Sequence, residues 1–228
     1  MTVNNLQIIV SRLTTILREI LFPCTCLVCS KGDKYLCNNC EQSVKLNAVE
    51  IINFNQTKPP LLYSALYSQV PVKTAIRNFK FQDLKSLSQP ISSWLNNYWQ
   101  LILNNDQTLP QNFLVIPVPL HRLRYLARGF NQAEILAKSF CEHFNYELIT
   151  NKVVTRNRNT PHQVGLKRFE RLVNLIDAFA VTDQEKIKNR DIIIIDDVIT
   201  TGATIEEIAK VLREAGAKKI IGLSVARD

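Results

Sequence analysis

Two adjacent carboxylates, Asp196 and Asp197, stand where a run of apolar residues meets a run of small ones. Four isoleucines precede them, and a segment without a polar face is typical of a central parallel strand covered by helices on both sides. The small residues that follow are Thr200, Thr201, Gly202, Ala203 and Thr204. Such a loop leaves backbone N–H groups accessible at a helix start, where an anion is favoured. The segment therefore predicts a phosphate loop, residues 200–204, beside acceptors for two neighbouring hydroxyls.

The same segment predicts one strand–helix–strand unit. We expect the first strand to end at the acid pair. Thr204 followed by Glu207 has the spacing of a capping box, which marks a helix start. The helix would run through Leu212 and end at Gly216, before a second apolar strand near residues 220–225. The alternative is a turn with no ligand, but adjacent carboxylates repel each other and a solvated helix cap does not require two. Ligand binding explains the pair better.

Two stretches of basic residues lie in the middle of the chain. The first, residues 121–132, contains Arg122, Arg124 and Arg128 without an acid and follows an apolar strand, a position where open α/β sheets bind ligands. We expect it to bind a polyanion, with Arg128 as the first choice. The second, residues 152–168, includes Arg156 and Arg158 and predicts a mobile loop that closes over a bound anion. The alternative for the first stretch is a solvated basic loop, and the alternatives for the second are contact with nucleic acid or plain solvation.

Four cysteines near the N-terminus form two Cys-x-x-Cys pairs with seven residues between them. They are Cys26, Cys29, Cys37 and Cys40. Two such pairs converge on one tetrahedral ion, so the spacing predicts a closed structural Zn²⁺ site in a small module at residues 23–45. A disulfide module is the alternative, but it needs an oxidising compartment. Cys24 is treated as spare, because it lies too close to Cys26 to complete the same pairs, and Cys141 is predicted to lie in the core.

Length and composition set the limits on the architecture. A chain of 228 residues, 46% hydrophobic and 21% charged, can bury one good core with a small attachment. No apolar run approaches the roughly 20 residues of a membrane span, so we expect a soluble, cytoplasmic protein. Residues 1–22 carry an amphipathic stripe interrupted by charges, unlike a signal peptide, and predict a docking helix. The net charge of +8 favours an anionic partner without identifying it.

The rest of the chain alternates between strand and helix patterns, which predicts an α/β domain over residues 61–228. A polar stretch that ends in Pro59-Pro60 marks a linker before it. Strands are predicted at residues 61–67 and 113–118, and helices at residues 72–79, 91–103 and 134–144.

Together these motifs resemble the ComF family, the competence protein F and GntX-like group. Its amino-terminal zinc module is similar to the cysteine pairs, and its most distinctive block is similar to residues 116–122 with 128–132. The loop residues that resemble the family are Asn159, Thr160, Gln163 and Arg171. The acid pair with its phosphate loop resembles the signature of type I phosphoribosyltransferases. Glycines common in the family are absent near Gln69 and Gln82, so Lys80 is a weaker candidate.

The resemblance implies a type I phosphoribosyltransferase fold, a parallel sheet flanked by helices, that binds phosphoribosyl pyrophosphate with Mg²⁺. It implies that Asp196 and Asp197 hold the ribose hydroxyls and that residues 200–204 hold the 5′-phosphate. Transfer to an unknown acceptor would release pyrophosphate, whose developing charge Arg128 and Mg²⁺ would stabilise. Asp196, Asp197 and Arg128 are then the catalytic set. The acceptor pocket is expected to come from residues 1–60.

The family's role in bacterial transformation implies further partners, namely single-stranded DNA and DNA-uptake or recombination proteins. Such DNA binding would be electrostatic and would use Arg122, Arg124, Arg156 and Arg158. The alternative function is a non-catalytic competence accessory protein that senses phosphoribosyl pyrophosphate or a nucleotide, or that binds DNA or proteins.

Overall fold

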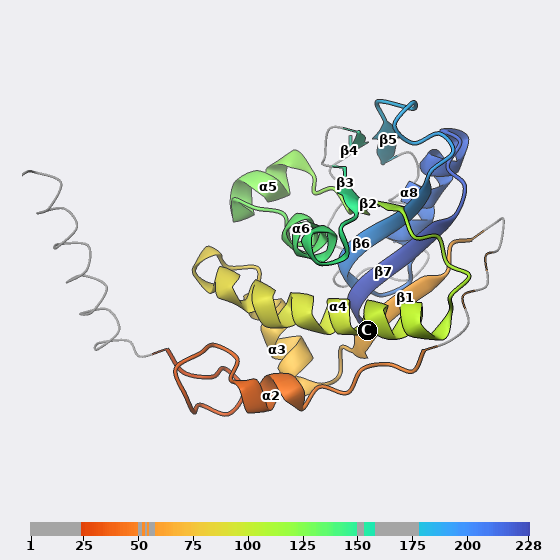
Figure 1. Cartoon of the computed structure of the whole chain (residues 1–228). Coiled ribbons are helices and arrows are strands. Elements are labelled where there is room, and N and C mark those ends of the chain that lie inside the picture. The colour runs from red at the N-terminus through yellow and green to blue at the C-terminus, as the bar shows by residue number, and fades with distance from the viewer. Residues whose placement is uncertain (1–23, 50–51, 53, 55–57, 150–152, 158–177) are drawn as a thin grey trace, which may run out of the picture.

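A five-stranded parallel sheet forms the centre of the molecule, in the order β1-β7-β6-β2-β3 (Figure 1). The computed structural model describes residues 24–49, 52, 54, 58–149, 153–157 and 178–228. The strands of the sheet are β1 (Leu61–Leu66), β2 (Phe113–Pro117), β3 (Glu147–Leu148), β6 (Asp191–Ile199) and β7 (Ile220–Arg227). Because all neighbours run parallel, every strand presents its carboxyl end at the same edge. The predicted α/β class is confirmed.

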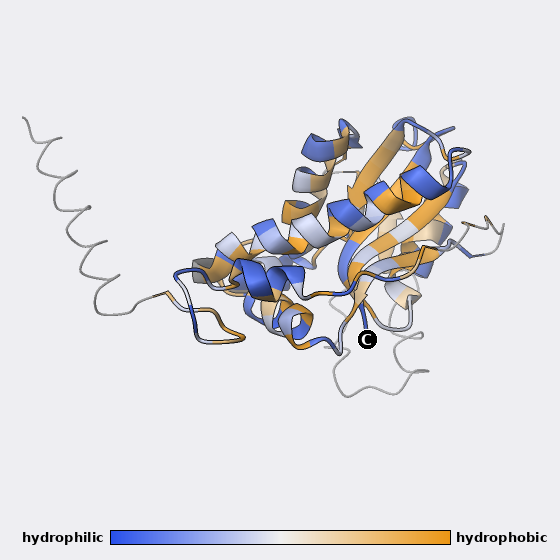
Figure 2. Ribbon diagram, turned by 60° about the horizontal axis from the view of Figure 1, so that its bottom comes forward, coloured by the Kyte–Doolittle hydropathy of each residue, from blue (hydrophilic) through white to orange (hydrophobic). Residues whose placement is uncertain are grey.

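Helices cover both faces of the sheet, as the isoleucine run predicts. Ile193 and Ile195 of β6 belong to one buried cluster, and Ile192 and Ile194 belong to the other. The long helices are α3 (Val70–Asn78), α4 (Ser88–Asn105), α6 (Gln132–Phe144) and α8 (Ala203–Glu214). The large buried hydrophobic residues of α4 lie in the first cluster, and the buried residues of α8 lie in the second. Figure 2 shows hydrophobic residues concentrated on the strands and hydrophilic ones on the outward sides of the helices.

The cysteine module packs directly onto the main domain. It contains the short helix α2 (Asn38–Gln42), which lies beside α3 and α4 (Figure 1). Cys26 and Leu36 belong to the same buried cluster as Trp94 of α4, whose Nε1 donates to the Glu41 carbonyl at 3.1 Å. The amide of Gln69 also binds both backbone groups of Lys45, at 2.8 Å each. The predicted docking helix at residues 1–22 lies outside the described residues.

The predicted strands and helices are confirmed to within a few residues, with two corrections around the acid pair. β6 does not end at the acids but continues to Ile199, because its last residues still pair with β7, Val198 with Ala226 and Ile199 with Arg227. The capping-box prediction at Thr204 is wrong as well. α8 begins at Ala203, and its N-cap is Gly202 in the left-handed region at φ 83°.

Several short elements were not predicted. The stretch at residues 121–132 begins with a helix, α5 (Arg122–Arg128), where the sequence suggested a basic loop. A 3₁₀ helix, η1 (Gln82–Leu87), joins α3 to α4. Strands β4 (Val154–Arg156) and β5 (Phe179–Val181) form a separate antiparallel pair. Within the described ranges, none of the helices has the length and apolar character needed to cross a membrane.

Candidate functional site

A pocket of about 370 Å³ opens at the carboxyl edge of the sheet. Strands β1, β6 and β7 end at the same level of the sheet, because Leu66 of β1 and Ile199 of β6 both pair with Arg227 of β7. The residues that follow these three strand ends are Tyr67, Thr200 and Asp228, and all three line the pocket. The register of the sheet thus brings segments from far apart in the sequence to one cavity.

The acid pair forms part of the pocket wall. β2 pairs with β6 only as far as Ile195, so Asp196 and Asp197 lie beyond the end of that neighbour. The Asp197 N–H donates to Asp196 Oδ1 at 2.9 Å, which fixes the first carboxylate. Burial, and then the charge of Asp197, raise the pKa of Asp196 well above its usual range, while Arg156 acts in the opposite direction. A ligand that supplies hydroxyl donors or positive charge would relieve this repulsion.

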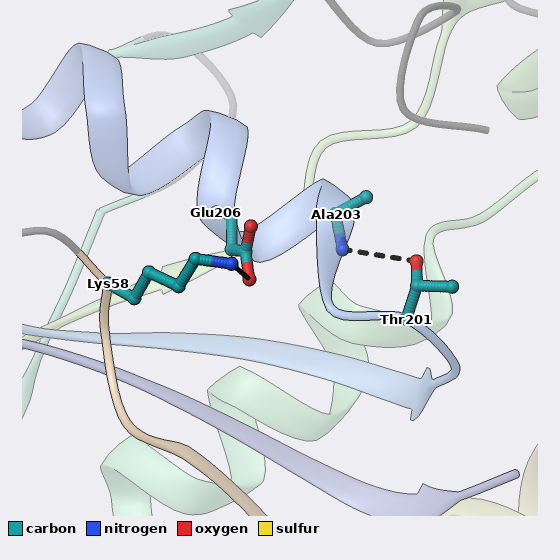
Figure 3. A network of polar contacts seen from close by, with 4 residues as sticks. All are labelled: Lys58, Thr201, Ala203 and Glu206. Atoms are coloured by element: carbon teal, nitrogen blue, oxygen red, sulfur yellow. Dashed lines mark hydrogen bonds and ion pairs between the residues drawn. The ribbon is translucent and has the colours of Figure 1, made fainter. Parts of the chain in front are cut away.

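The phosphate loop connects β6 to α8, and all of its residues line the pocket. Gly202 adopts φ 83°, a conformation that glycine reaches without the steric cost paid by residues with a Cβ. Thr201 Oγ1 accepts from the Ala203 N–H at 3.4 Å, as Figure 3 shows. The first N–H groups of a helix have no partner within the helix, and the positive end of the helix dipole lies there. The loop lines the pocket at a helix start, and phosphate binding there stays a prediction.

Residues at the start of β1 and just before it contact the phosphate loop and the first turn of α8. A Cβ added at Gly202 would overlap the side chain of Leu61, and one at Gly222 would lie 2.8 Å from Leu61 Cδ2. Leu61 thus fills a notch that exists because both positions are glycine. Beside it, Lys58 Nζ lies 3.2 Å from Glu206 Oε1 in the first turn of α8 (Figure 3). Close packing at this notch fixes where the loop lies relative to the sheet.

Positive charge gathers in the same pocket. Arg124 and Arg128 of α5 and Arg156 of β4 all line it, and we call these three residues the arginine cluster. The four-residue spacing puts the first two on one face of their helix. Burial and then the charge of Arg128 lower the pKa of Arg124, and burial and then Arg124 lower the pKa of Arg156 to about 10. These cations repel one another, which favours a polyanion between them.

The structure brings the predicted site residues together, although their roles stay predictions. The acid pair, Arg128 and residues 200–204 all line the pocket, and so does Lys80, the weaker candidate. His121 caps α5, with its Nδ1 accepting from the Leu123 N–H at 3.3 Å. Arg122 is exposed and does not line the pocket, and Arg158 lies outside the described residues.

Tyr67, Ile76 and Asp228 line the pocket but were missed from the sequence. Their placement depends on which strands are neighbours, which no local motif reveals. The one available signal was position, since Tyr67 and Asp228 each directly follow an apolar strand. The carboxyl ends of strands are where open α/β sheets bind ligands.

The four cysteines of the two Cys-x-x-Cys pairs form a second cluster. Their Sγ atoms all lie within 4.8 Å of one another, and their thiols are free. Sulfurs bound at about 2.3 Å to a tetrahedral Zn²⁺ would be about 3.8 Å apart, so the donors fit this ion. Burial would raise the pKa of Cys26, but N–H groups, first that of Cys37, lower it to about 6. A thiolate is the form that binds metal.

Comparison with known proteins gives consistent results. A model of the phosphoribosyl transferase domain family matches residues 126–227. The chain is 33% identical over 159 residues to competence protein F of Haemophilus influenzae, covering 69% of this chain and 68% of that protein. It is 31% identical over 205 residues to the DNA utilization protein YhgH of Shigella flexneri, covering 86% of each. It is 28% identical over 145 residues to competence protein ComFC of Bacillus subtilis, covering 64% and 55%.

Proposed function

Because this chain belongs to the ComF family of proteins with a type I phosphoribosyltransferase fold, we propose that it binds phosphoribosyl pyrophosphate with Mg²⁺ and transfers phosphoribose to an acceptor. One observation carries the proposal. The acid pair, the phosphate loop and the arginine cluster line a single pocket. They match the three parts of this ligand, which are a ribose with two free hydroxyls, a 5′-phosphate and a pyrophosphate.

Each group has a task that its chemistry supports. The carboxylates of Asp196 and Asp197 accept hydrogen bonds from the ribose 2′ and 3′ hydroxyls, and bonds to charged acceptors are the stronger kind. Residues 200–204 donate backbone N–H groups to the 5′-phosphate. The arginine cluster faces the pyrophosphate, because guanidinium groups match phosphate geometry.

Transfer breaks the bond between the ribose anomeric carbon and pyrophosphate, and the electron pair leaves with pyrophosphate. The acceptor supplies the pair for the new bond. Negative charge grows on the leaving oxygen, so fixed cations such as Arg128 stabilise the transition state more than the ground state. Mg²⁺, if held with the substrate, would neutralise part of the same charge. The acid pair fixes the sugar while its carbon gains positive character.

We also propose that Cys26, Cys29, Cys37 and Cys40 hold one structural Zn²⁺. The convergence of their sulfurs and the lowered pKa of Cys26 support it. Four protein ligands leave no open coordination position, which is typical of a structural site. The ion would stabilise the turns of residues 24–45, where only a short helix is present.

The arginine cluster favours a second candidate function, the binding of single-stranded DNA. Relatives are named for competence and for DNA utilization, and a phosphate backbone would meet the same cations. Arg122 would extend this surface, and the sequence assigns Arg158, which lies outside the described residues, to DNA binding as well. Affinity should then fall with salt at a log–log slope of about −0.7 per neutralised phosphate. Phosphoribosyl pyrophosphate should compete with the strand. DNA-uptake or recombination proteins would be the protein partners.

Isotope-labelled phosphoribosyl pyrophosphate tests the transferase directly. The purified protein is incubated with the label, Mg²⁺ and a panel of bases, amines and DNA ends, and products are identified by mass spectrometry. A labelled adduct that depends on Arg128 supports transfer. Binding of the label without a product from any acceptor would make the protein a sensor of the ligand instead. Absence of binding would contradict both.

A further inference from the structure

We propose that Gln132 is a positioning residue for the proposed transfer, and that its side-chain amide holds the Arg128 guanidinium where the pyrophosphate of the ligand would meet it. The inference rests on the proposed function, because it assigns the group that orients one of the cations. Arg128 lines the pocket, whereas Gln132 does not. An effect of Gln132 on the ligand is therefore expected to pass through Arg128.

The contact between the two side chains joins two helices across a turn. Arg128 is the last residue of α5, and Gln132 is the first residue of α6. Gly129 ends α5 in the left-handed region at φ 74°, which lets the chain turn between the helices. Arg128 Nη1 donates to Gln132 Oε1 at 3.1 Å. Because Gln132 is only 3% exposed, its amide contacts the guanidinium from the protein interior rather than from solvent.

The start of α6 is anchored, so the amide is a fixed support. Asn131 Nδ2 donates to the Val118 carbonyl at 3.0 Å, while Asn131 Oδ1 caps the start of α6. Val118 directly follows β2 and lines the pocket. The ring centroid of Phe130 lies 5.9 Å from that of Phe79 in the buried core. These contacts tie the turn to the strand end and to the core, which leaves the amide little freedom to move.

Packing alone does not explain an amide at position 132. A guanidinium has only donors, so the amide oxygen faces it and the NH₂ group points away. Nε2 of Gln132 is then buried, with no hydrogen-bond partner among the described residues. A buried donor without an acceptor lowers stability, whereas an apolar side chain of the same shape would not. A group that lowers stability in this way is better explained by a function than by packing.

The charges in the pocket indicate what the amide does. Burial, and then the charge of Arg128, lower the pKa of Arg124, so the two guanidinium groups repel each other. Before a ligand binds, this repulsion favours orientations of Arg128 that lead away from the arginine cluster. The amide oxygen opposes it by accepting a hydrogen bond, yet it carries no net charge and leaves the guanidinium charge available to an anion. A carboxylate in the same place would compensate that charge.

Calorimetry tests the inference with three probes, namely phosphoribosyl pyrophosphate, inorganic pyrophosphate and ribose 5-phosphate, each with Mg²⁺. Gln132→Met keeps the size of the side chain but removes both polar atoms. We expect it to weaken the two pyrophosphate-bearing probes about tenfold, and ribose 5-phosphate by no more than about twofold. In an Arg128→Met background, the same change should alter the affinity for these two probes by less than about twofold, because its effect passes through the guanidinium.

Urea unfolding separates positioning from packing. Gln132→Met should unfold no earlier than the wild type, because it removes an unpaired buried donor. Gln132→Glu is a second variant, which keeps an acceptor beside Arg128 but compensates its charge, and it should also weaken the pyrophosphate-bearing probes about tenfold. Gln100→Met is the matched control. It removes an exposed amide contact on α4, from Gln100 Nε2 to Asn104 Oδ1 at 3.0 Å, and should change neither stability nor affinity appreciably.

The outcomes distinguish this inference from the proposed function. If the wild type does not bind phosphoribosyl pyrophosphate, the proposed function fails, and inorganic pyrophosphate then tests the orientation of Arg128 by itself. If it binds neither pyrophosphate-bearing probe, both fail. The positioning role is wrong if the wild type binds such a probe and either Gln132→Met or Gln132→Glu binds it equally well. It is also wrong if the loss persists in the Arg128→Met background, or if Gln132→Met unfolds markedly earlier than the wild type.

Discussion

The two halves of the pocket are built in different ways. The acid pair and the phosphate loop come from nine consecutive residues, 196–204, on one strand and the helix that follows it. The opposite wall, formed by Tyr67, Ile76 and Asp228, comes from the ends of β1 and β7 and from α3. A common substrate such as phosphoribosyl pyrophosphate can be bound by one local motif, whereas the assembled half can change with each of its segments.

The two halves of the pocket also contact different parts of the molecule. The phosphate loop rests on Leu61 and on the ion pair of Lys58 with Glu206. The wall of Tyr67, Ile76 and Asp228 is tied to the cysteine module through Gln69 and Lys45, and Trp94 joins the same module to α4. Perturbing each support should therefore affect one half of the pocket more than the other.

Loss of metal should have the largest effect. We expect the double variant Cys37→Ser with Cys40→Ser to lose Zn²⁺ and to lower the melting temperature by roughly 10 °C, because structural zinc contributes folding energy and Cys26 lies in the shared core. Hydrogen exchange should rise more at residues 65–76 than at residues 196–204. Cys24→Ser is the control, since Cys24 is outside the sulfur cluster. Stoichiometric zinc in the double variant would exclude this site.

The second largest effect on stability is expected when the notch beside the phosphate loop is filled. Gly202→Ala places a Cβ against Leu61 and forces a residue with a Cβ into the left-handed region, so we expect a loss of about 2–4 kcal/mol in urea unfolding. Leu61→Ala in the same chain makes room for the methyl group. The double variant should then be more stable than the sum of the single changes predicts, by about 1 kcal/mol. Simple additivity would mean that Leu61 does not support the loop.

Removing one of the repelling charges should raise stability moderately. The raised pKa of Asp196 means that the folded state binds its proton more tightly than the unfolded chain, where the pKa is about 3.9. As pH rises from that value through the raised pKa, the wild type loses stability, and the loss is complete above it. Asp196→Asn avoids this loss, so we expect about 1 kcal/mol of added stability at neutral pH and none in acid. A destabilised variant at neutral pH would contradict the assignment.

The continuous half of the site could be predicted from sequence because its signals are local. Buried isoleucines, paired acids and small residues follow one another, so their proximity needs no knowledge of the fold. The predicted end of β6 and start of α8 were wrong, because contacts between residues far apart in the sequence set both. β7 extends β6 through the acids to Ile199, and the packing of Leu61 requires glycine at 202, so the helix begins before Thr204. The wall of Tyr67, Ile76 and Asp228 could not be predicted, because the proximity of Tyr67 and Asp228 depends on strand order.

The smallest effect is expected for the ion pair that ties the linker to α8. Lys58 is mostly exposed, and exposed pairs contribute about 0–1 kcal/mol. Lys58→Ala should therefore change stability by less than about 1 kcal/mol and ligand affinity by no more than about twofold. Lys186→Ala, which removes a comparable exposed pair with Asp183, serves as the control in thermal unfolding. A much larger loss in the first variant would make the ion pair, rather than Leu61, the main support of the loop.

Calorimetry of phosphoribosyl pyrophosphate with Mg²⁺ tests most directly whether the acid pair holds the sugar. Asp196→Asn with Asp197→Asn keeps the side-chain size but removes both charged acceptors, and hydrogen bonds to charged groups contribute about 1.5–3 kcal/mol each. We predict that the wild type binds and that the double variant binds at least tenfold more weakly. Asp191→Asn, at the opposite end of β6, should bind like the wild type. Equal affinity in the double variant and the wild type would contradict the account.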